Sequence, residues 1–376
     1  MTPDAFLKDV RDFASGPVAE GAAQWSLGTT PDPTLWRAAA DLGLLRMTVP
    51  TAEGGLGFAF PTLVAACEAL ATVDFGFAMS LVNSHNVGRR LCLSAPEAVR
   101  ARYLPRIMAA DISACTALTE PGTGSDFAAI TTLAHETGSG WEITGEKTWI
   151  VNGRDAGFAI VFAQTADTGE ARGIGGFLVD LTQSGVQRHA IESAFSQTSM
   201  GTGGFTLDHA QAHLLLPPGQ AFKSILTEIN AARTYVASMA NAMLAAALTE
   251  ARAYGATRQS FGQTLDQYPS WHTPLECAAR DLAQAQAYTA TAVAQIASGA
   301  EAQLAAARAK VTAVVAAQRH LPEMLHAMGA EGLRPARCFT RHLAAAQIAG
   351  LTDGATNLLR ERVSKLSAPR HDIPEG

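Results

Sequence analysis

Three short strings of the chain combine residue types that can bind ligands or take part in catalysis. The first runs from Thr119 to Asp126 and reads T-E-P-G-T-G-S-D. The second runs from Gly145 to Ile150 and reads G-E-K-T-W-I, and the third, R-Q-S-F-G, begins at Arg258. Together they offer hydroxyl groups, carboxylates, an indole ring and a guanidinium. A guanidinium can bind a pyrophosphate through two parallel hydrogen bonds. The chemistry of the chain is therefore inferred first from these strings.

The first two strings together resemble the signature of the acyl-CoA dehydrogenase family, flavoenzymes that oxidise acyl thioesters. The glycine-rich turn at 54–57 also matches an N-terminal signature of that family, so the resemblance covers essentially the whole chain. It implies FAD as the cofactor, because no side chain can accept a hydride. It also implies α,β-dehydrogenation of an acyl thioester, linked either to CoA or to an acyl-carrier protein.

Five residues in or beside these two strings match family positions that contact FAD. Leu118 and Thr119 match positions beside the flavin ring, and Ser125 matches the segment that contacts the pyrophosphate and the substrate. Trp149 matches the indole that covers the other face of the flavin, although a tryptophan is more commonly a core residue. Val151 stands where the family usually has Thr or Ser, so the resemblance implies that one hydroxyl contact near flavin N5 is lost.

Four residues of the C-terminal half correspond to positions that complete a flavin site. Arg258 and Phe261 lie in a string similar to the family's R-x-x-F-G, whose arginine reaches the FAD of a neighbouring subunit. An exposed helical arginine is the alternative interpretation. His326 and Ala330 replace a glutamine and a glycine at positions that mainly face a neighbour's FAD or the substrate. The resemblance therefore implies a homo-oligomer (dimer or tetramer) or a hetero-oligomer with a sister subunit.

The catalytic base is expected at Asp353. In most of the family the base is a glutamate about 20 residues after a glycine turn, and an ungapped count from the turn at 328–333 reaches Asp353. Burial would raise the pKa of this carboxylate toward the working range. Aspartate is one methylene shorter, and a displacement of about 1 Å can cost about 100-fold in rate. Helix N-capping is the alternative role. Arg233 lies 25 residues before Arg258, the spacing between two arginines of the family, so the resemblance implies that it helps to position the base; a surface salt bridge is the alternative.

Other positions of the chain depart from the family pattern, and two further functions stay open for this reason. One is a divergent, flavin-poor or non-catalytic subunit of a heteromeric acyl-CoA dehydrogenase. The other is an oxidase resembling nitroalkane oxidase, a relative in which an aspartate is the base. Besides the residues already named, the altered positions are Gln197, Pro269, Ala344, Ala345 and Ala355.

The segment that holds the first two strings has the pattern of a β-domain. Short apolar runs alternate there with Gly, Thr and Asp, which predicts strands separated by reverse turns. The predicted strands include 141–144, 158–162, 176–179 and 204–207.

Helical patterns occupy both flanks of this β-domain. The N-terminal flank includes apolar stretches at 61–83 and 96–110, and the alanine-rich C-terminal flank predicts a bundle from 222–255, 274–298 and 300–328. The chain is therefore predicted to be an α+β multi-domain protein of the acyl-CoA dehydrogenase fold. Its parts are an N-terminal helical domain at 1–110, a middle β-barrel-like domain at 111–217 and a C-terminal helical bundle at 218–376.

The composition indicates a globular chain. Its net charge of −6 argues against nucleic-acid binding, which needs a concentrated basic face. The five cysteines are widely spaced without a C-x-x-C pair, so we expect no metal site and a reducing compartment. The first residues lack a secretory pattern, and no apolar run of about 18 residues predicts a membrane span. We expect a cytoplasmic protein, and the family resemblance implies an electron-accepting flavoprotein as a partner.

Overall fold

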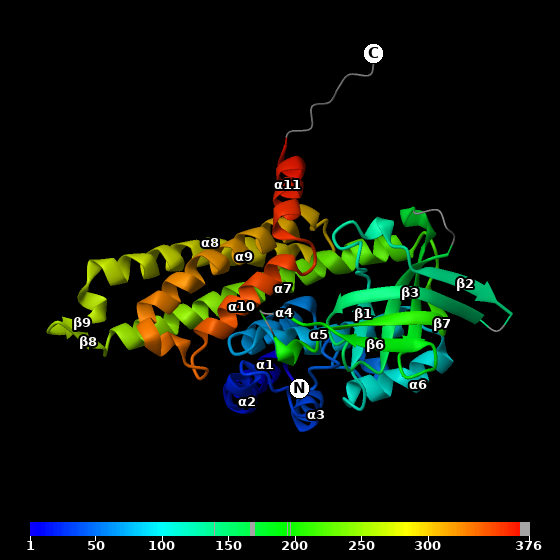
Figure 1. Ribbon diagram of the computed structural model, residues 1–376, viewed down its shortest axis with the longest axis horizontal. Coiled ribbons are helices and arrows are strands. Elements are labelled where there is room, and N and C mark those ends of the chain that lie inside the picture. Colours follow the sequence, from blue (N-terminus) through cyan, green and yellow to red (C-terminus); the bar gives the residue numbers. More distant parts are fainter. Residues whose placement is uncertain (139, 166–169, 194, 196, 369–376) are drawn as a thin grey trace, which may run out of the picture.

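The computed structural model describes residues 1–138, 140–165, 170–193, 195 and 197–368. Helices come first along the chain, a β-domain follows, and a helical bundle ends the described part (Figure 1). This order agrees with the predicted fold class. The N-terminal helices are α1 (Pro3–Phe13), α2 (Ala19–Trp25), α3 (Pro33–Leu42), α4 (Phe60–Ala71), α5 (Phe75–Ser94) and α6 (Glu97–Met108).

The single long helix predicted over 61–83 is wrong, because the chain breaks between α4 and α5. Asp74 lies at the break and caps α5, since its Oδ1 accepts a hydrogen bond of 2.7 Å from the backbone N–H of Phe77. The same oxygen accepts a 2.6 Å bond from the Ser199 hydroxyl, so the cap is joined to the β-domain. A capped N-terminus satisfies backbone donors that would otherwise be unpaired. The apolar pattern runs through the break and hides it.

The middle part is a seven-stranded sheet that closes on itself. The strand order is β1-β4-β2-β3-β7-β5, β4 also pairs with β5, and β6 pairs with β7. The extra β4–β5 pairing joins the two ends of the path from β4 to β5, which makes the sheet barrel-like, as predicted. Every residue of β4 is buried. The strands are β1 (Ala114–Ala117), β2 (Leu133–Thr137), β3 (Gly140–Ile150), β4 (Phe158–Gln164), β5 (Ile174–Asp180), β6 (Val186–Ala190) and β7 (Gly203–Leu216).

The C-terminal bundle packs on the N-terminal helices. One hydrophobic core includes residues of α1, α4 and α5 together with residues of α7 to α10, so the two helical parts share their interior. Much of the bundle's contribution is alanine, whose small side chain lets helices approach closely. The bundle helices are α7 (Ala221–Gly255), α8 (Pro269–Ala297), α9 (Gln303–Met328), α10 (Phe339–Leu351) and α11 (Thr356–Ser367).

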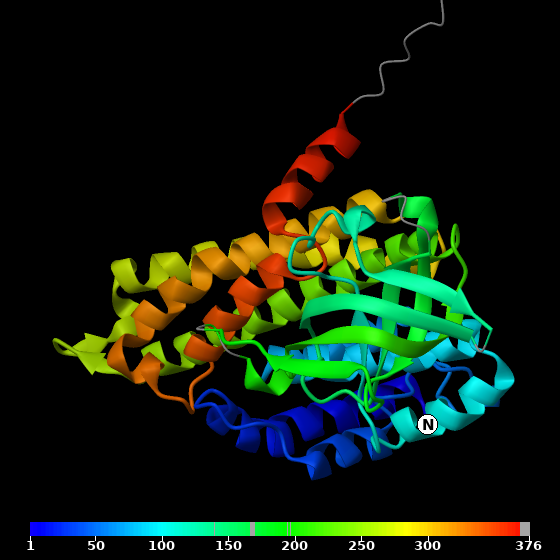
Figure 2. The same ribbon diagram turned by 45° about the vertical axis from the view of Figure 1, so that its right-hand side comes forward.

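Two features project from this body. The hairpin of β8 (Gln259–Ser260) and β9 (Gln263–Thr264) extends from the end of the bundle that lies far from the β-domain (Figure 1). Helix α11 also points away from the other helices, as the turned view makes clear (Figure 2). Among the described residues, no helix has both the length and the apolar character needed to cross a membrane.

Candidate active site

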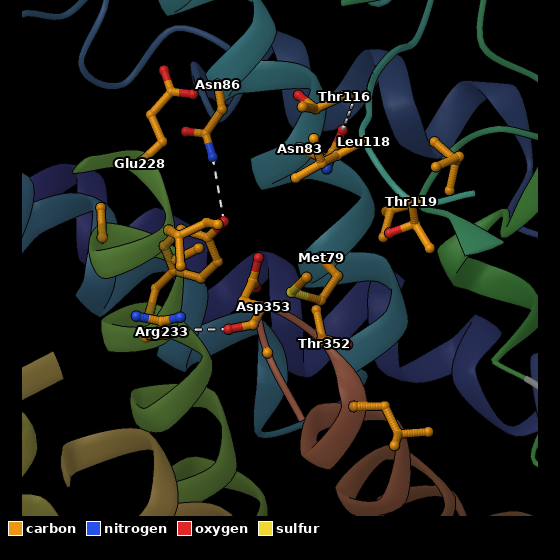
Figure 3. A pocket seen from close by; sticks show the side chains of 18 of the residues that line it. Met79, Asn83, Asn86, Thr116, Leu118, Thr119, Glu228, Arg233, Thr352 and Asp353 are labelled. Atoms are coloured by element: carbon orange, nitrogen blue, oxygen red, sulfur yellow. Dashed lines mark hydrogen bonds between the residues drawn. The ribbon is translucent and has the colours of Figure 1, made fainter. Parts of the chain in front are cut away.

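A cavity of about 1470 Å³ lies where the three parts of the chain meet. Its wall includes residues of α5, β1, α7 and the loop between α10 and α11 (Figure 3). Seven of the predicted site residues line this cavity, which brings together positions more than 200 residues apart in sequence. They are Leu118, Thr119, Ser125, Trp149, Val151, Arg233 and Asp353.

The loop that carries Asp353 has a strained backbone. Asp353 has a φ of 53° and Gly354 a φ of 103°, both in the left-handed region. A non-glycine residue held there costs about 1–3 kcal/mol, although aspartate tolerates it better than most residues. Strain of this kind persists only where the surroundings fix the loop.

Two buried cations fix this loop through its carbonyl groups. Arg233 donates from Nε to the carbonyl oxygen of Asp353 at 3.1 Å, as Figure 3 shows. Lys310 donates from Nζ to the carbonyl oxygen of Gly354 at 2.6 Å and also to that of Thr352. Three consecutive carbonyl groups are therefore held by two side chains from α7 and α9.

The carboxylate of Asp353 is left without such a contact. Its Oδ2 is buried, and no described residue gives it a hydrogen bond. Burial raises the pKa of Asp353, and the charges of Lys310 and Arg233 oppose that rise. A buried acceptor without a partner is rare in a stable interior and often marks a functional group. Asp353 lines the cavity and has a carboxylate oxygen that no other described residue binds, which is the arrangement expected of a proton acceptor.

The structure rejects the alternative roles for both residues of this pair. Helix α11 is capped at Ala355 with no side-chain hydrogen bond, so Asp353 is not a helix cap. Arg233 is only 6% exposed and donates to a main-chain carbonyl, so it does not form a surface salt bridge.

Lys310 is the residue that the sequence reasoning missed. It is completely buried in α9, and burial lowers its pKa to about 8, while the nearby Asp353 charge opposes this fall. A buried lysine is rare unless it is paired. The sequence does contain a clue to Lys310: it lies in a stretch rich in alanine and valine at 304–317, which predicts an interior helix face. Without attention to that context, a lysine in a helix is taken to be exposed to solvent.

The first two sequence strings lie side by side and are joined by a buried ion pair. Glu120 and Lys147 approach to 2.8 Å, and Lys147 also donates to the carbonyl oxygen of Leu118 at 3.1 Å. Glu120 further accepts bonds from the backbone and hydroxyl groups of Thr131 and Thr132. Burial by itself would raise the pKa of Glu120, but Lys147 and these bonds lower it to about 2. The conspicuous charges of the two strings therefore hold Leu118 at the cavity wall.

Trp149 faces the cavity with an indole that is 55% exposed. The core position that we gave as the alternative is therefore wrong. Its φ of 57° is in the left-handed region, which is an outlier for an aromatic residue and indicates a held conformation. The backbone N–H of Thr148, the preceding residue, donates to the carbonyl oxygen of Thr119 at 3.0 Å. A large apolar surface exposed inside a cavity fits a flat ring stacked upon it.

Ser125 connects this wall with the loop of the expected base. Its hydroxyl accepts a bond of 3.5 Å from the backbone N–H of Ala355, two residues after Asp353. Val151 lines the same cavity and packs against the large helical core. The expected flavin positions and the expected base thus share one cavity.

Arg258, Phe261, His326 and Ala330 do not line this cavity. They gather at the far end of the bundle, where the C-terminus of α7, the β8–β9 hairpin and the C-terminus of α9 meet (Figure 1). All four are exposed, and Phe261 is 99% exposed at the tip of the hairpin. Its φ of 44° with the 87° of Gly262 gives the two positive values of a tight hairpin turn. Within a single chain these residues cannot complete the cavity.

Three family profiles match consecutive parts of the chain. The acyl-CoA dehydrogenase N-terminal domain matches residues 2–111, the middle domain residues 115–210 and the C-terminal domain residues 219–367. The chain therefore belongs to the acyl-CoA dehydrogenase family.

Individual relatives and solved structures agree with this membership. The human mitochondrial short-chain specific acyl-CoA dehydrogenase is 30% identical over 269 residues, which is 70% of this chain and 65% of that enzyme. The chain is thus aligned with just under two thirds of this relative's length. Butyryl-CoA dehydrogenase from Megasphaera elsdenii has a TM-score of 0.91 at 23% identity, over 97% of this chain and 98% of that one. A glutaryl-CoA dehydrogenase from Mycobacterium smegmatis, solved with FADH2, has a TM-score of 0.90 at 24% identity, over 97% of this chain and 94% of that one.

Enzymes of this family are FAD-dependent oxidoreductases that act on CH–CH bonds. The predictions of the family and the fold class are therefore confirmed. The roles of the individual site residues stay predictions.

Proposed function

We propose that this chain catalyses the FAD-dependent α,β-dehydrogenation of an acyl thioester to a trans-2-enoyl thioester. The observation that carries this proposal is the buried, unpaired Oδ2 of the half-buried Asp353, held on a clamped and strained loop beside the cavity. Asp353 accepts the α-proton of the substrate, and its raised pKa suits it to do so near neutral pH. Aspartate oxidases of the nitroalkane type are the enzymatic alternative.

The cavity wall fits a flavin. Leu118, Thr119, Ser125, Trp149 and Val151 would hold it, with the half-exposed indole of Trp149 against one ring face. Bound FAD supplies the acceptor for the β-hydride, which no side chain can provide.

Arg233 and Lys310 act through the loop rather than on the substrate. By holding the carbonyl groups on both sides of Asp353, they fix the position of its shorter side chain. A fixed backbone is important here, because misplacement of a base by about 1 Å can cost about 100-fold in rate.

The second copy of the chain, or a sister subunit, would complete the flavin site. Exposure of Arg258, Phe261, His326 and Ala330 at the far end of the bundle supports this assembly, since they can meet only another subunit's ligand. We further propose a cytoplasmic enzyme with the three domains predicted from sequence, although residues 369–376 of the last domain lie outside the described part. Its substrate is carried by CoA or a carrier protein, and its electrons pass to a flavoprotein.

The test is the absorption spectrum of the purified chain. We expect a yellow oligomer whose flavin bands are bleached when acyl thioesters are added without oxygen. A colourless chain that gains flavin only with a sister protein would support the non-catalytic subunit instead. Peroxide formation with a nitroalkane, but no bleaching by thioesters, would support the oxidase.

A further inference from the structure

The cavity beside Asp353 is bordered by two helices that place polar side chains on its wall. On α5 the wall residues Met79, Asn83 and Asn86 are spaced i, i+4 and i+7, which places them on one face of the helix. On α7 the residues Glu228 and Tyr235 have the same i, i+7 relation. Figure 3 shows Asn83, Asn86 and Glu228 around the space next to Asp353.

Asn86 and Arg90 of α5 both form hydrogen bonds to α7 near this part of the cavity. The Nδ2 of Asn86 donates to the hydroxyl of Tyr235 at 3.4 Å. Arg90 donates from Nε to Glu228 at 2.8 Å and from Nη2 to the Ser224 hydroxyl at 2.6 Å. The pKa of Tyr235 is raised well above its usual value by burial, and then by the charges of Asp353 and Glu228 among others. The hydroxyl of Tyr235 is therefore influenced by the charges of both carboxylates and is hydrogen-bonded to Asn86.

Asn83 adds an unused donor to this wall. Its Oδ1 accepts a 3.2 Å bond from the backbone N–H of Thr116, which fixes the orientation of the amide. No described residue accepts a hydrogen bond from its Nδ2. Two fixed polar groups, Asn83 and the Asn86–Tyr235 pair, therefore face the space that a substrate would enter beyond its α- and β-carbons.

We propose, on the basis of the function proposed above, that the substrate is an acyl thioester carrying a neutral hydrogen-bonding oxygen on the chain, a hydroxyl or oxo group beyond the β-carbon. A saturated chain would remove water from Asn83 and Tyr235 without replacing its hydrogen bonds, which is costly. An oxygen atom of the substrate restores them. Glu228 is already paired with Arg90, and Arg89, which also lines the cavity, is exposed to water, where an ion pair contributes only about 0–1 kcal/mol. The wall therefore favours a neutral group.

The experiment compares CoA thioesters of matched length. Saturated acyl-CoAs of four to eight carbons are compared with the corresponding compounds bearing a hydroxyl or oxo group at carbon 4 or beyond, and with acyl-CoAs ending in a carboxylate. We expect kcat/KM to be at least about tenfold higher for the oxygenated compounds, because a site built for a hydrogen bond rejects an analogue that lacks it. A preference for the saturated or the carboxylate-ended compounds would overturn the inference.

Two variants locate the preference in the wall. Asn83→Leu and Tyr235→Phe should each reduce the ratio of oxygenated to saturated kcat/KM about tenfold, and Tyr235→Phe changes only one hydroxyl group. Leu93→Met, a volume-conserving change at an exposed position of the same helix away from the cavity, should keep the ratio. An unchanged ratio in both polar variants would contradict the assignment.

A binding measurement separates this inference from the proposed activity. Calorimetric titration of the Asp353→Asn protein with the same CoA thioesters should show the same preference without turnover. If the wild-type protein dehydrogenates no thioester but the Asp353→Asn protein still binds the oxygenated compounds more tightly, the proposed activity fails and the inference stands. If thioesters are dehydrogenated but neither turnover nor binding favours the oxygenated compounds, only the inference fails.

Discussion

Replacement of Lys310 by methionine should misplace Asp353 and change its ionisation. The side chain loses its bonds to the carbonyl groups of Thr352 and Gly354, and each buried acceptor left unpaired costs about 1–3 kcal/mol. The left-handed conformation of Asp353 itself costs about 1–3 kcal/mol, so the lost bonds are comparable with the strain that they oppose. The loop should therefore relax. We expect flavin reduction to slow by about 100-fold.

The charge of Lys310 also affects the pH dependence of flavin reduction, which a merely structural role of this residue would not change. Lys310 is the charge that lowers the pKa of Asp353 most, so its removal should raise that pKa further. Because Asp353 must be deprotonated to accept a proton, activity rises as pH rises through its pKa. The acidic limb of the pH–rate profile should therefore move to higher pH.

The assay is stopped-flow reduction of the bound flavin by a saturating thioester between pH 5 and 9. Lys223→Met, an exposed change on α7 away from the cavity, is the matched control and should leave both the rate and the limb unchanged. A Lys310→Met protein with the wild-type rate of flavin reduction and the wild-type acidic limb would refute the role of Lys310 in positioning Asp353.

Three further results are expected. Glu120→Gln leaves Lys147 buried without its partner and should destabilise the fold by about 3–5 kcal/mol in urea unfolding at pH 7. Because the folded pKa of Glu120 is about 2, below the usual value of 4.5, the wild-type advantage should decline as pH falls from about 5 toward 2; a constant advantage would contradict this pairing. Trp149→Ala should weaken FAD binding about tenfold in a flavin-release titration, whereas unchanged binding would exclude the stacked indole. Arg258→Met should weaken FAD binding if a neighbouring subunit supplies this arginine. When Arg258→Met and Trp149→Ala chains are refolded together, some sites then combine an intact Trp149 with an intact Arg258, so part of the tight FAD binding should return. No return of tight binding would argue against completion of the site by a neighbouring subunit.

The strings that revealed the family also contain or adjoin part of the cavity wall. Leu118, Thr119, Ser125 and Trp149 occur in contiguous motifs, so their neighbourhood is visible in the sequence. Asp353 was reached by counting from a turn, and the structure places it in the same cavity. Residues of one short string can be predicted to lie together because they are adjacent in sequence and therefore stay close in space in any fold.

Contacts made through the main chain could not be predicted in this way. Lys310 acts on carbonyl groups 42 and 44 residues away, and carbonyl groups have no residue type that a pattern can reveal. The break at Asp74 was hidden because an apolar pattern continues through it, and the polar face of Asn83 and Asn86 was hidden with it. The cluster at the far end of the bundle depends on a second chain, so its role remains a prediction.

The most direct test of the account is the rate at which an acyl thioester reduces the flavin of the Asp353→Asn protein without oxygen. Asparagine has nearly the same shape and tolerates the left-handed backbone, so the loop and the FAD content should be kept. Asp41→Asn, an exposed change on α3, is the control and should reduce flavin at the wild-type rate. The account predicts that Asp353→Asn binds FAD but reduces it about 100-fold more slowly or worse. Reduction at the wild-type rate would contradict the assignment of Asp353 as the base.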